Sequence, residues 1–286
     1  MSGEHTASIW SRPGLTPSFA ADCIALDVDG VLIDTTASFR EATRITAAEV
    51  QRVMGKGMPW TPTATDIGML KHAGGFNDDI DCSIALAAVG LAGREHELAA
   101  VCRAVDVAGG GLDGLRVAAP DLPRISGRLV LRIFNEHYWG GLRDAERALV
   151  DADLPQRIRE LGVRHVALIT GRTPAELDAA LTLLAWAPGD LDAVVSGDQL
   201  HKPDPACLDR VIEITGAERL VMVGDTRDDW EMVRRHRERG RGSVELRAVS
   251  VGDEDAADAL RSLGVDATLE RARDLPELLI RWAAPG

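Results

Sequence analysis

The sequence predicts an α/β protein with a doubly wound parallel sheet and an inserted helical domain. Short apolar runs that each end in small polar residues alternate with helical patterns over about 120 residues near the C-terminal end. A long stretch between the first and second of these runs shows helical spacing alone. These two observations indicate one α/β domain that is interrupted by a helical one.

Four apolar runs are interpreted as buried strands. Their apolar residues follow one another without alternation, which is typical of strands covered on both faces of a parallel sheet. The runs begin at Cys23, His165, Ala193 and Leu220. Leu246–Val251 and Ala267–Leu269 are expected to add edge strands.

Helix starts are recognisable between these strands. Thr173-Pro174-Ala175-Glu176 combines an N-cap residue, a proline at the first helical position and a capping-box glutamate, and apolar residues then follow at helical spacing. Asp204-Pro205 opens another helix in the same way. Alternation of strand and helix is the pattern of a doubly wound fold.

The domain boundaries follow from where this alternation stops. Residues 1–20 are expected to be an N-terminal tail, residues 21–35 and 156–286 the α/β core, and residues 36–155 a helical cap. The chain leaves the core after its first strand, so the cap is expected over the carboxyl ends of the strands. Ligands bind at that edge in such sheets.

Composition restricts the partners. The 286 residues carry a formal net charge of −13, which argues against a nucleic-acid or anionic-membrane surface and favours a small-molecule partner. The four cysteines lack the spacing of a metal site and are expected to be reduced, buried thiols. No apolar run approaches the roughly 18 residues that span a bilayer, and we expect a cytoplasmic protein.

The first strand ends in Asp27-Val28-Asp29-Gly30, which places two carboxylates one residue apart. One carboxylate can attack a phosphoryl group and form an aspartyl-phosphate, while the other protonates the leaving oxygen and later activates water. The alternative is an ordinary turn, because Asp and Gly favour turns.

Three further elements supply what phosphate chemistry needs. Thr170-Gly171 precedes a helix start, where a hydroxyl and free N–H groups can hold phosphate oxygens, although an ordinary helix cap would look the same. Lys202 can neutralise a phosphoryl group or can be a surface charge. Asp225, followed by Asp228 and Asp229, makes an acidic cluster that requires a cation, and carboxylates with waters suit Mg²⁺.

In their order and positions, Asp27, Thr170, Lys202 and Asp225 resemble the four motifs of the haloacid dehalogenase-like (HAD) superfamily, whose core is Rossmann-like. The resemblance covers about Cys23–Asp34 and Leu161–Ala283. The position of the insert resembles the C1 helical cap of subfamily I, and the cap sequence resembles a small subfamily-IA group.

The resemblance implies a role for each residue. Asp27 would be the nucleophile and a metal ligand, and Asp29 the general acid/base that lends its backbone carbonyl to the metal. Asp225 would bind Mg²⁺. Thr170, Gly171 and Lys202 would bind phosphate. Either Asp228 or Asp229 would support Lys202 or a metal-bound water.

The implied activity is Mg²⁺-dependent hydrolysis of a small phosphate monoester through an aspartyl-phosphate. Haloacid dehalogenases proper lack the second aspartate of the first motif, so Asp29 argues against dehalogenation. A phosphotransferase or phosphomutase would keep Asp29 and stays an alternative. A non-catalytic binding module is the other alternative, although it predicts loss of a motif residue and none is missing.

Substrate contacts are expected from the cap and from the second motif. Lys71 and Asn77 belong to a polar, glycine-hinged segment, residues 69–79, that resembles part of the cap of a small subfamily-IA group, some of whose members carry histidine-biosynthesis names. The alternative is a Gly-Gly turn followed by an Asn/Asp helix cap. Arg172 adjoins the second motif and is a third candidate. Histidinol phosphate, phosphoglycolate and sugar phosphates are the candidate substrates.

Overall fold

The structure is a computed structural model that describes residues 9–15, 18–55, 57–240 and 244–284, and only the backbone of residue 255. The chain divides into two compact units. Unit 1 comprises Met1–Asp34 and Arg147–Gly286, and unit 2 comprises Thr35–Glu146. Unit 2 ends at Glu146, before the expected boundary at residue 155, because the residues after Glu146 form a strand and a helix of unit 1.

In the described residues, unit 1 contains a seven-stranded sheet in the order β1-β9-β8-β7-β2-β5-β6. The strands are β1 (Ile9–Ser11), β2 (Cys23–Leu26), β5 (His165–Ile169), β6 (Ala193–Val195), β7 (Arg219–Gly224), β8 (Glu245–Val251) and β9 (Ala267–Leu269). All neighbouring strands are parallel except β1 and β9. The predicted parallel α/β core is therefore confirmed.

The predicted edge position of β8 and β9 is wrong. β8 lies between β7 and β9, and β9 is itself covered by β1, in which Ile9 pairs with Leu269. The segment expected to be a tail thus contributes the edge strand. Its three residues are too short to give a strand signal of their own, and they are ordered by pairing with β9.

Alternate residues of each central strand enter two different hydrophobic cores. Ile24 and Leu26 of β2 belong to one core, whereas Cys23 and Ala25 belong to the other. Successive side chains of a strand point to opposite faces of the sheet, so both faces are buried. This burial explains why the sequence runs are apolar without alternation.

Helices cover both faces of the sheet. The helices α7 (Leu154–Glu160), α8 (Pro174–Leu184) and α12 (Leu275–Ala283) pack on the first core, and α9 (Ala206–Thr215), α10 (Arg227–Arg239) and α11 (Glu254–Leu263) pack on the second. The predicted capping box is present, because the Glu176 carboxylate accepts hydrogen bonds from the N–H and hydroxyl of Thr173. Burial of each large aliphatic side chain contributes about 1.5–3 kcal/mol.

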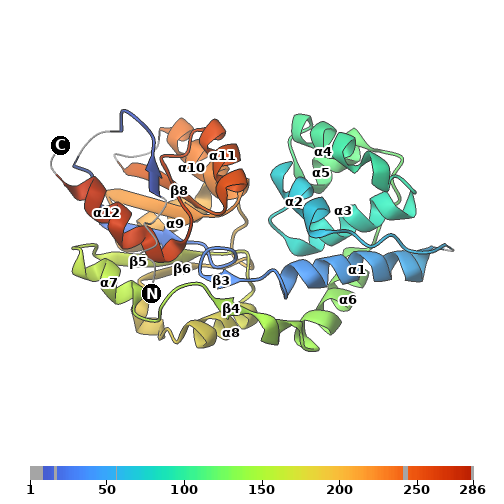
Figure 1. Cartoon of the computed structure of the whole chain (residues 1–286), viewed down its shortest axis with the longest axis horizontal. Coiled ribbons are helices and arrows are strands. Elements are labelled where there is room, and N and C mark those ends of the chain that lie inside the picture. The colour runs from blue at the N-terminus through green and yellow to red at the C-terminus, as the bar shows by residue number, and fades with distance from the viewer. Residues whose placement is uncertain (1–8, 16–17, 56, 241–243, 285–286) are drawn as a thin grey trace, which may run out of the picture. The chain divides into compact units, whose positions relative to one another are not determined.

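Unit 2 is helical throughout its described residues, apart from turns and loops (Figure 1). Its helices are α1 (Phe39–Met54), α2 (Ala64–His72), α3 (Asp79–Leu91), α4 (Leu98–Val107), α5 (Gly111–Ala118) and α6 (Gly127–Trp139). They surround a core that includes Val50, Leu86 and Ile133. These helices occupy the stretch whose sequence shows helical spacing alone.

Two antiparallel segments join the units at one place in unit 1. The short strands β3 (Ile33–Asp34) and β4 (Arg147–Ala148) pair with each other, Ile33 opposite Ala148. Unit 2 is therefore inserted between two paired strands, a few residues after β2.

None of the described helices combines the length and the apolar character that crossing a bilayer requires. All four cysteines are buried and free of disulfides, as predicted.

Candidate active site

Three adjacent strands bring the motif residues together. β2 pairs with β7 on one side and with β5 on the other. Asp27 follows β2, Asp225 follows β7 and Thr170 follows β5. Because parallel strands end at the same edge of a sheet, these residues lie at one place although they are almost 200 positions apart in sequence (198 between Asp27 and Asp225).

The turn after β2 is built around Gly30. Asp27 continues the sheet by donating its N–H to the carbonyl of Val223 (2.9 Å), and the chain then folds back so that Gly30 donates to the carbonyl of Ile33 (2.9 Å). Gly30 has a φ of 74°, and a Cβ at this position would lie 2.1 Å from Oδ2 of Asp225. Glycine is therefore required here both by the backbone and by the close approach of Asp225.

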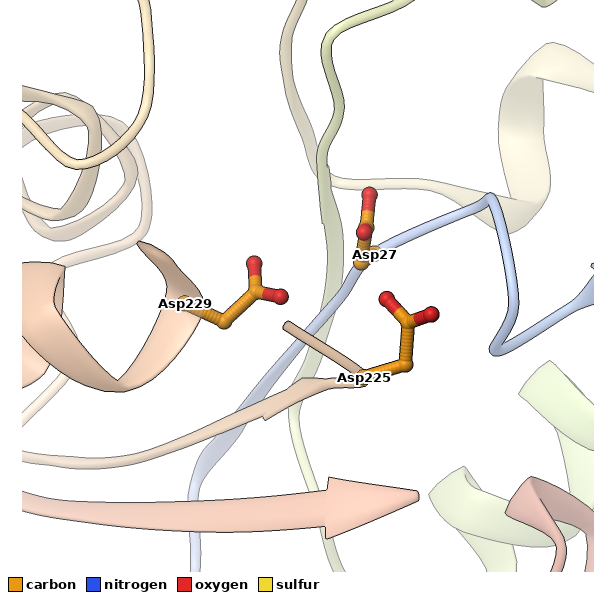
Figure 2. Close-up of side chains that lie close together, drawn as sticks. All are labelled: Asp27, Asp225 and Asp229. Atoms are coloured by element: carbon orange, nitrogen blue, oxygen red, sulfur yellow. The ribbon is translucent and has the colours of Figure 1, made fainter. Parts of the chain in front are cut away.

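Asp27, Asp225 and Asp229 form a cluster of carboxylates. One oxygen from each of the three lies within 4.8 Å of the others. Figure 2 shows that the side chains come from the ends of two strands and from the start of a helix, and that they gather in one place. The donor set consists of carboxylate oxygens alone, which is the set that hard divalent cations prefer.

Lys202 bridges two members of this cluster. Its Nζ lies 2.8 Å from Oδ2 of Asp27 and 2.8 Å from Oδ1 of Asp229, and its side chain is only 2% exposed. Burial alone would lower the pKa of Lys202, but Asp229 and Asp27 together raise it above its ordinary value. Lys202 is therefore a fixed positive charge beside Asp27.

Burial raises the pKa of Asp27 well above its ordinary value. Lys202 acts in the opposite direction, while the neighbouring carboxylates of Asp229, Asp225 and Asp29 raise the pKa further. The cluster therefore holds more negative charge than Lys202 balances. A divalent cation at the same place would relieve this repulsion.

Thr170 and Gly171 form a tight loop at the end of β5. The Thr170 hydroxyl oxygen accepts a hydrogen bond from the N–H of Arg172 (3.2 Å), so its own hydrogen is available to another acceptor. Gly197 packs against this loop, and a Cβ on it would lie 2.1 Å from the carbonyl oxygen of Gly171. The loop is thus held by a backbone approach that only glycine permits.

A family model described as "haloacid dehalogenase-like hydrolase" matches residues 21–237. This range contains β2, all four motif residues and most of the core. The chain belongs to the haloacid dehalogenase-like hydrolase family. The resemblance predicted from the motifs is therefore confirmed, and no curated protein matched the chain.

Several solved structures share the fold of this HAD-like hydrolase. Phosphatase Tt82 from Thermococcus thioreducens is 28% identical, with a TM-score of 0.62 over 84% of this chain and 99% of that one. A putative phosphoglycolate phosphatase from Lactobacillus delbrueckii subsp. bulgaricus is 18% identical, with a TM-score of 0.65 over 92% and 99%. A putative beta-phosphoglucomutase from Thermotoga maritima is 18% identical, with a TM-score of 0.52 over 91% and 98%.

The side chain of Asp29 is not one of the three clustered carboxylates of this HAD-like hydrolase. It pairs with Arg172, whose Nη2 is 2.7 Å from Oδ1 of Asp29. Arg172 was expected to contact substrate, yet its side chain is fully buried. Of the two candidate supporting acids, Asp229 contacts Lys202 and accepts hydrogen bonds from the N–H and hydroxyl of Thr226. Asp228 is buried at the same helix start.

The cap candidates Lys71 and Asn77 lie in unit 2. Lys71 forms an ion pair with Asp79 (3.1 Å), and Asn77 is half-buried. The segment between them is anchored by a hydrogen bond from the N–H of Gly111 to the carbonyl of Gly74 (2.9 Å). The segment therefore has a defined conformation within unit 2.

Sequence reasoning did not identify the roles of Gly30, Gly197 and the Arg172–Asp29 pair. Gly30 and Gly197 each follow a predicted strand directly, and that position was the available signal. The identity of the atom that each glycine approaches depends on which strands are neighbours. The Arg172–Asp29 pair depends on the same adjacency, because the two residues follow β5 and β2.

Proposed function

We propose that this protein is a Mg²⁺-dependent phosphatase that hydrolyses a small-molecule phosphate monoester through an aspartyl-phosphate on Asp27. The observation that carries the proposal is the surroundings of Asp27. This residue is buried at a strand end, 2.8 Å from the Lys202 ammonium and beside two further carboxylates. Phosphatase Tt82, at 28% identity, supports the assignment of the reaction.

The site residues fit a divalent cation. Four aspartates carry the negative charge of the site: Asp27, Asp29, Asp225 and Asp229. With all four carboxylates ionised, Lys202 and Arg172 leave a formal charge of −2 on these six side chains, and of −1 once Asp29 carries the proton that it donates. Asp27 and Asp225, with the backbone carbonyl of Asp29, would hold the ion. A bound Mg²⁺ would offset the charge of the transferring phosphoryl group and of the nucleophile.

Asp27 begins the reaction. One of its carboxylate oxygens attacks phosphorus, a P–O bond to Asp27 forms, and the bond from phosphorus to the ester oxygen breaks. Lys202 remains beside Asp27 and stabilises the charge on the phosphoryl oxygens. The Thr170 hydroxyl donates to one of these oxygens and orients the group for in-line attack.

Asp29 acts first as the general acid and then as the general base. It donates a proton to the ester oxygen as this oxygen departs, and the alcohol leaves neutral. The resulting carboxylate then takes a proton from water, whose oxygen attacks phosphorus while the electron pair of the P–O bond returns to Asp27. The cycle releases free phosphate and returns Asp29 to its starting, protonated form.

We further propose that unit 2 acts as a cap and selects a small phosphorylated metabolite. The chain enters unit 2 after β3 and leaves it before β4, and β3 directly follows the turn that contains Asp29 and Gly30. This position of the insertion supports the role. Lys71 and Asn77 stay proposed substrate contacts within it. Histidinol phosphate, phosphoglycolate and sugar phosphates are the compounds to compare in a phosphate-release screen.

The test is substitution of the nucleophile. Asp27→Asn should abolish release of inorganic phosphate from p-nitrophenyl phosphate with Mg²⁺, since an amide does not form the aspartyl-phosphate, and EDTA should abolish wild-type activity. Asp178→Asn, which changes an exposed aspartate on α8, is the matched control and should retain activity. Near-full, EDTA-sensitive activity in Asp27→Asn would refute the mechanism.

The same assay distinguishes hydrolysis from phosphotransfer. A phosphotransferase or mutase would consume the ester while the phosphate appears on another acceptor. Hydrolysis predicts one free phosphate for each alcohol released. A persistent deficit of free phosphate would favour the transfer reaction on this site.

A further inference from the structure

Asp29 is held by a buried arginine. Both Nε and Nη2 of Arg172 donate to the same oxygen, Oδ1 of Asp29, at 2.9 and 2.7 Å. The Arg172 side chain is 0% exposed, whereas that of Asp29 is 33% exposed. The contact therefore fixes one oxygen of a carboxylate that otherwise reaches solvent, and it leaves Oδ2 for other partners.

Arg172 is itself fixed from several directions. Its Nη1 donates to the carbonyl of Glu176 in the first turn of α8 (3.1 Å). Its backbone N–H donates to the Thr170 hydroxyl (3.2 Å), and its carbonyl accepts from the N–H of Gly197 (2.9 Å). A guanidinium held in this way is an anchored group and is poorly suited to follow a mobile substrate.

The two carboxylates of the first motif have different cations. Asp27 pairs with Lys202, which follows β6, and Asp29 pairs with Arg172, which follows β5. A planar guanidinium that donates two N–H groups restricts the orientation of its acceptor more than a point charge does. Asp29 is consequently oriented independently of the nucleophile.

We propose that Arg172 is a positioning residue, which holds Oδ1 of Asp29 so that Oδ2 carries the proton to the leaving oxygen. This inference rests on the proposed phosphatase function. The proton moves from Oδ2 to the ester oxygen as the P–O bond breaks, and Oδ2 later receives a proton from the attacking water. Oδ1 stays hydrogen-bonded to Arg172 throughout, and Arg172 neither gains nor loses a proton.

The proposal predicts a dependence on the leaving group that a structural role does not. Arg172→Met removes the guanidinium but keeps much of the buried volume. Phenyl phosphate has a more basic leaving group than p-nitrophenyl phosphate and needs the proton more. General-acid catalysis contributes on the order of 10²-fold or more, so kcat/KM should fall about 100-fold for phenyl phosphate and less than about 10-fold for p-nitrophenyl phosphate.

Three further variants make the measurement decisive. Arg172→Lys should restore part of the loss with phenyl phosphate. Arg247→Met changes another buried arginine, whose guanidinium lies over the rings of Phe19 and Trp282, and it should affect the two esters equally. In an Asp29→Asn background, Arg172→Met should cause no further change in the ratio of the two kcat/KM values, because Arg172 acts through Asp29.

The outcomes separate this inference from the proposed function. If the wild-type protein releases no phosphate from either ester, the proposed function fails. If the wild-type protein is active but Arg172→Met lowers both kcat/KM values by the same factor, the positioning role is overturned. A rise in KM alone, equal for both esters, would identify Arg172 as a binding group and would overturn it as well. If Arg172→Met does not fold, Arg172→Lys gives the same comparison, measured alone and in the Asp29→Asn background.

Discussion

Gly30→Ala should separate the carboxylate of Asp225 from its working position. The new Cβ would lie 2.1 Å from Oδ2 and 2.6 Å from Cγ of Asp225, whereas real Cβ contacts essentially never fall below 3.0 Å. Oδ2 must therefore move by about 0.9 Å. The carboxylate of Asp225 is short and belongs to the cluster with Asp27, so it cannot yield without leaving the place where a cation would bind.

Two effects of this substitution have different sizes. The φ of 74° at Gly30 is costly for any residue with a Cβ, by about 1–2 kcal/mol of stability. A displacement of about 1 Å in an active site lowers the rate by on the order of 100-fold. We therefore expect a modest loss of stability but a large loss of kcat/KM, together with a higher Mg²⁺ concentration for half-maximal activity.

The assay compares Gly30→Ala with Gly216→Ala. Gly216 has a similar φ of 66°, but no atom lies within 4 Å of the position that its Cβ would take, so it carries the backbone cost alone. Phosphate release is measured across a Mg²⁺ titration, and urea unfolding gives the stability of both variants. Equal kcat/KM and equal Mg²⁺ dependence in the two variants would refute the argument that Asp225 requires glycine at position 30.

Two other predictions concern buried groups. Lys202→Met leaves the buried carboxylates of Asp27 and Asp229 without their shared cation, so urea unfolding without metal should show a loss of about 3–5 kcal/mol that Mg²⁺ partly restores; unchanged stability without metal would contradict the charge balance. Burial raises the pKa of Cys23 to about 12 and that of Cys102 and Cys207 to about 11. Below these pKa values the thiols stay protonated, with about 0.1% thiolate or less at pH 8. A disulfide reagent should therefore label the native protein slowly and the urea-unfolded protein fully. Rapid labelling of the native protein would contradict this prediction, because it would show that these thiols are accessible.

The sequence was sufficient for the buried strands because both faces of the sheet are covered. Ile24 and Leu26 enter one core while Cys23 and Ala25 enter the other, and the sequence therefore shows one unbroken apolar run. The helix at Pro174 was equally predictable from the sequence, since its start depends on local hydrogen bonds between Thr173 and Glu176. Helix starts that depend on local hydrogen bonds and strands that are buried on both faces can therefore be predicted from a sequence.

Features that depend on strand order were beyond the sequence. Three residues from Ile9 to Ser11 become a strand only because β9 offers a free edge. Arg172 follows Gly171 at a helix start, where arginines usually face solvent, and it is buried only because β5 is the neighbour of β2 and brings Asp29 within reach. The pairing is therefore a property of the assembled sheet, and no spacing within the chain encodes it.

The strand order also determines from which strand each charged residue enters the site. In the sequence β7-β2-β5-β6, Asp225 and Asp229 follow β7, on one side of Asp27, whereas Arg172 and Lys202 follow β5 and β6, on the other. A chain with a net charge of −13 repels an anionic ester at long range. At short range, Lys202 contacts both Asp27 and Asp229 and, under the proposed function, would offer a place for phosphate oxygens, while Asp225 beside Asp27 would offer a place for Mg²⁺. Asp27, the proposed nucleophile, touches both Lys202 and the carboxylate cluster and is therefore the residue that both groups would approach.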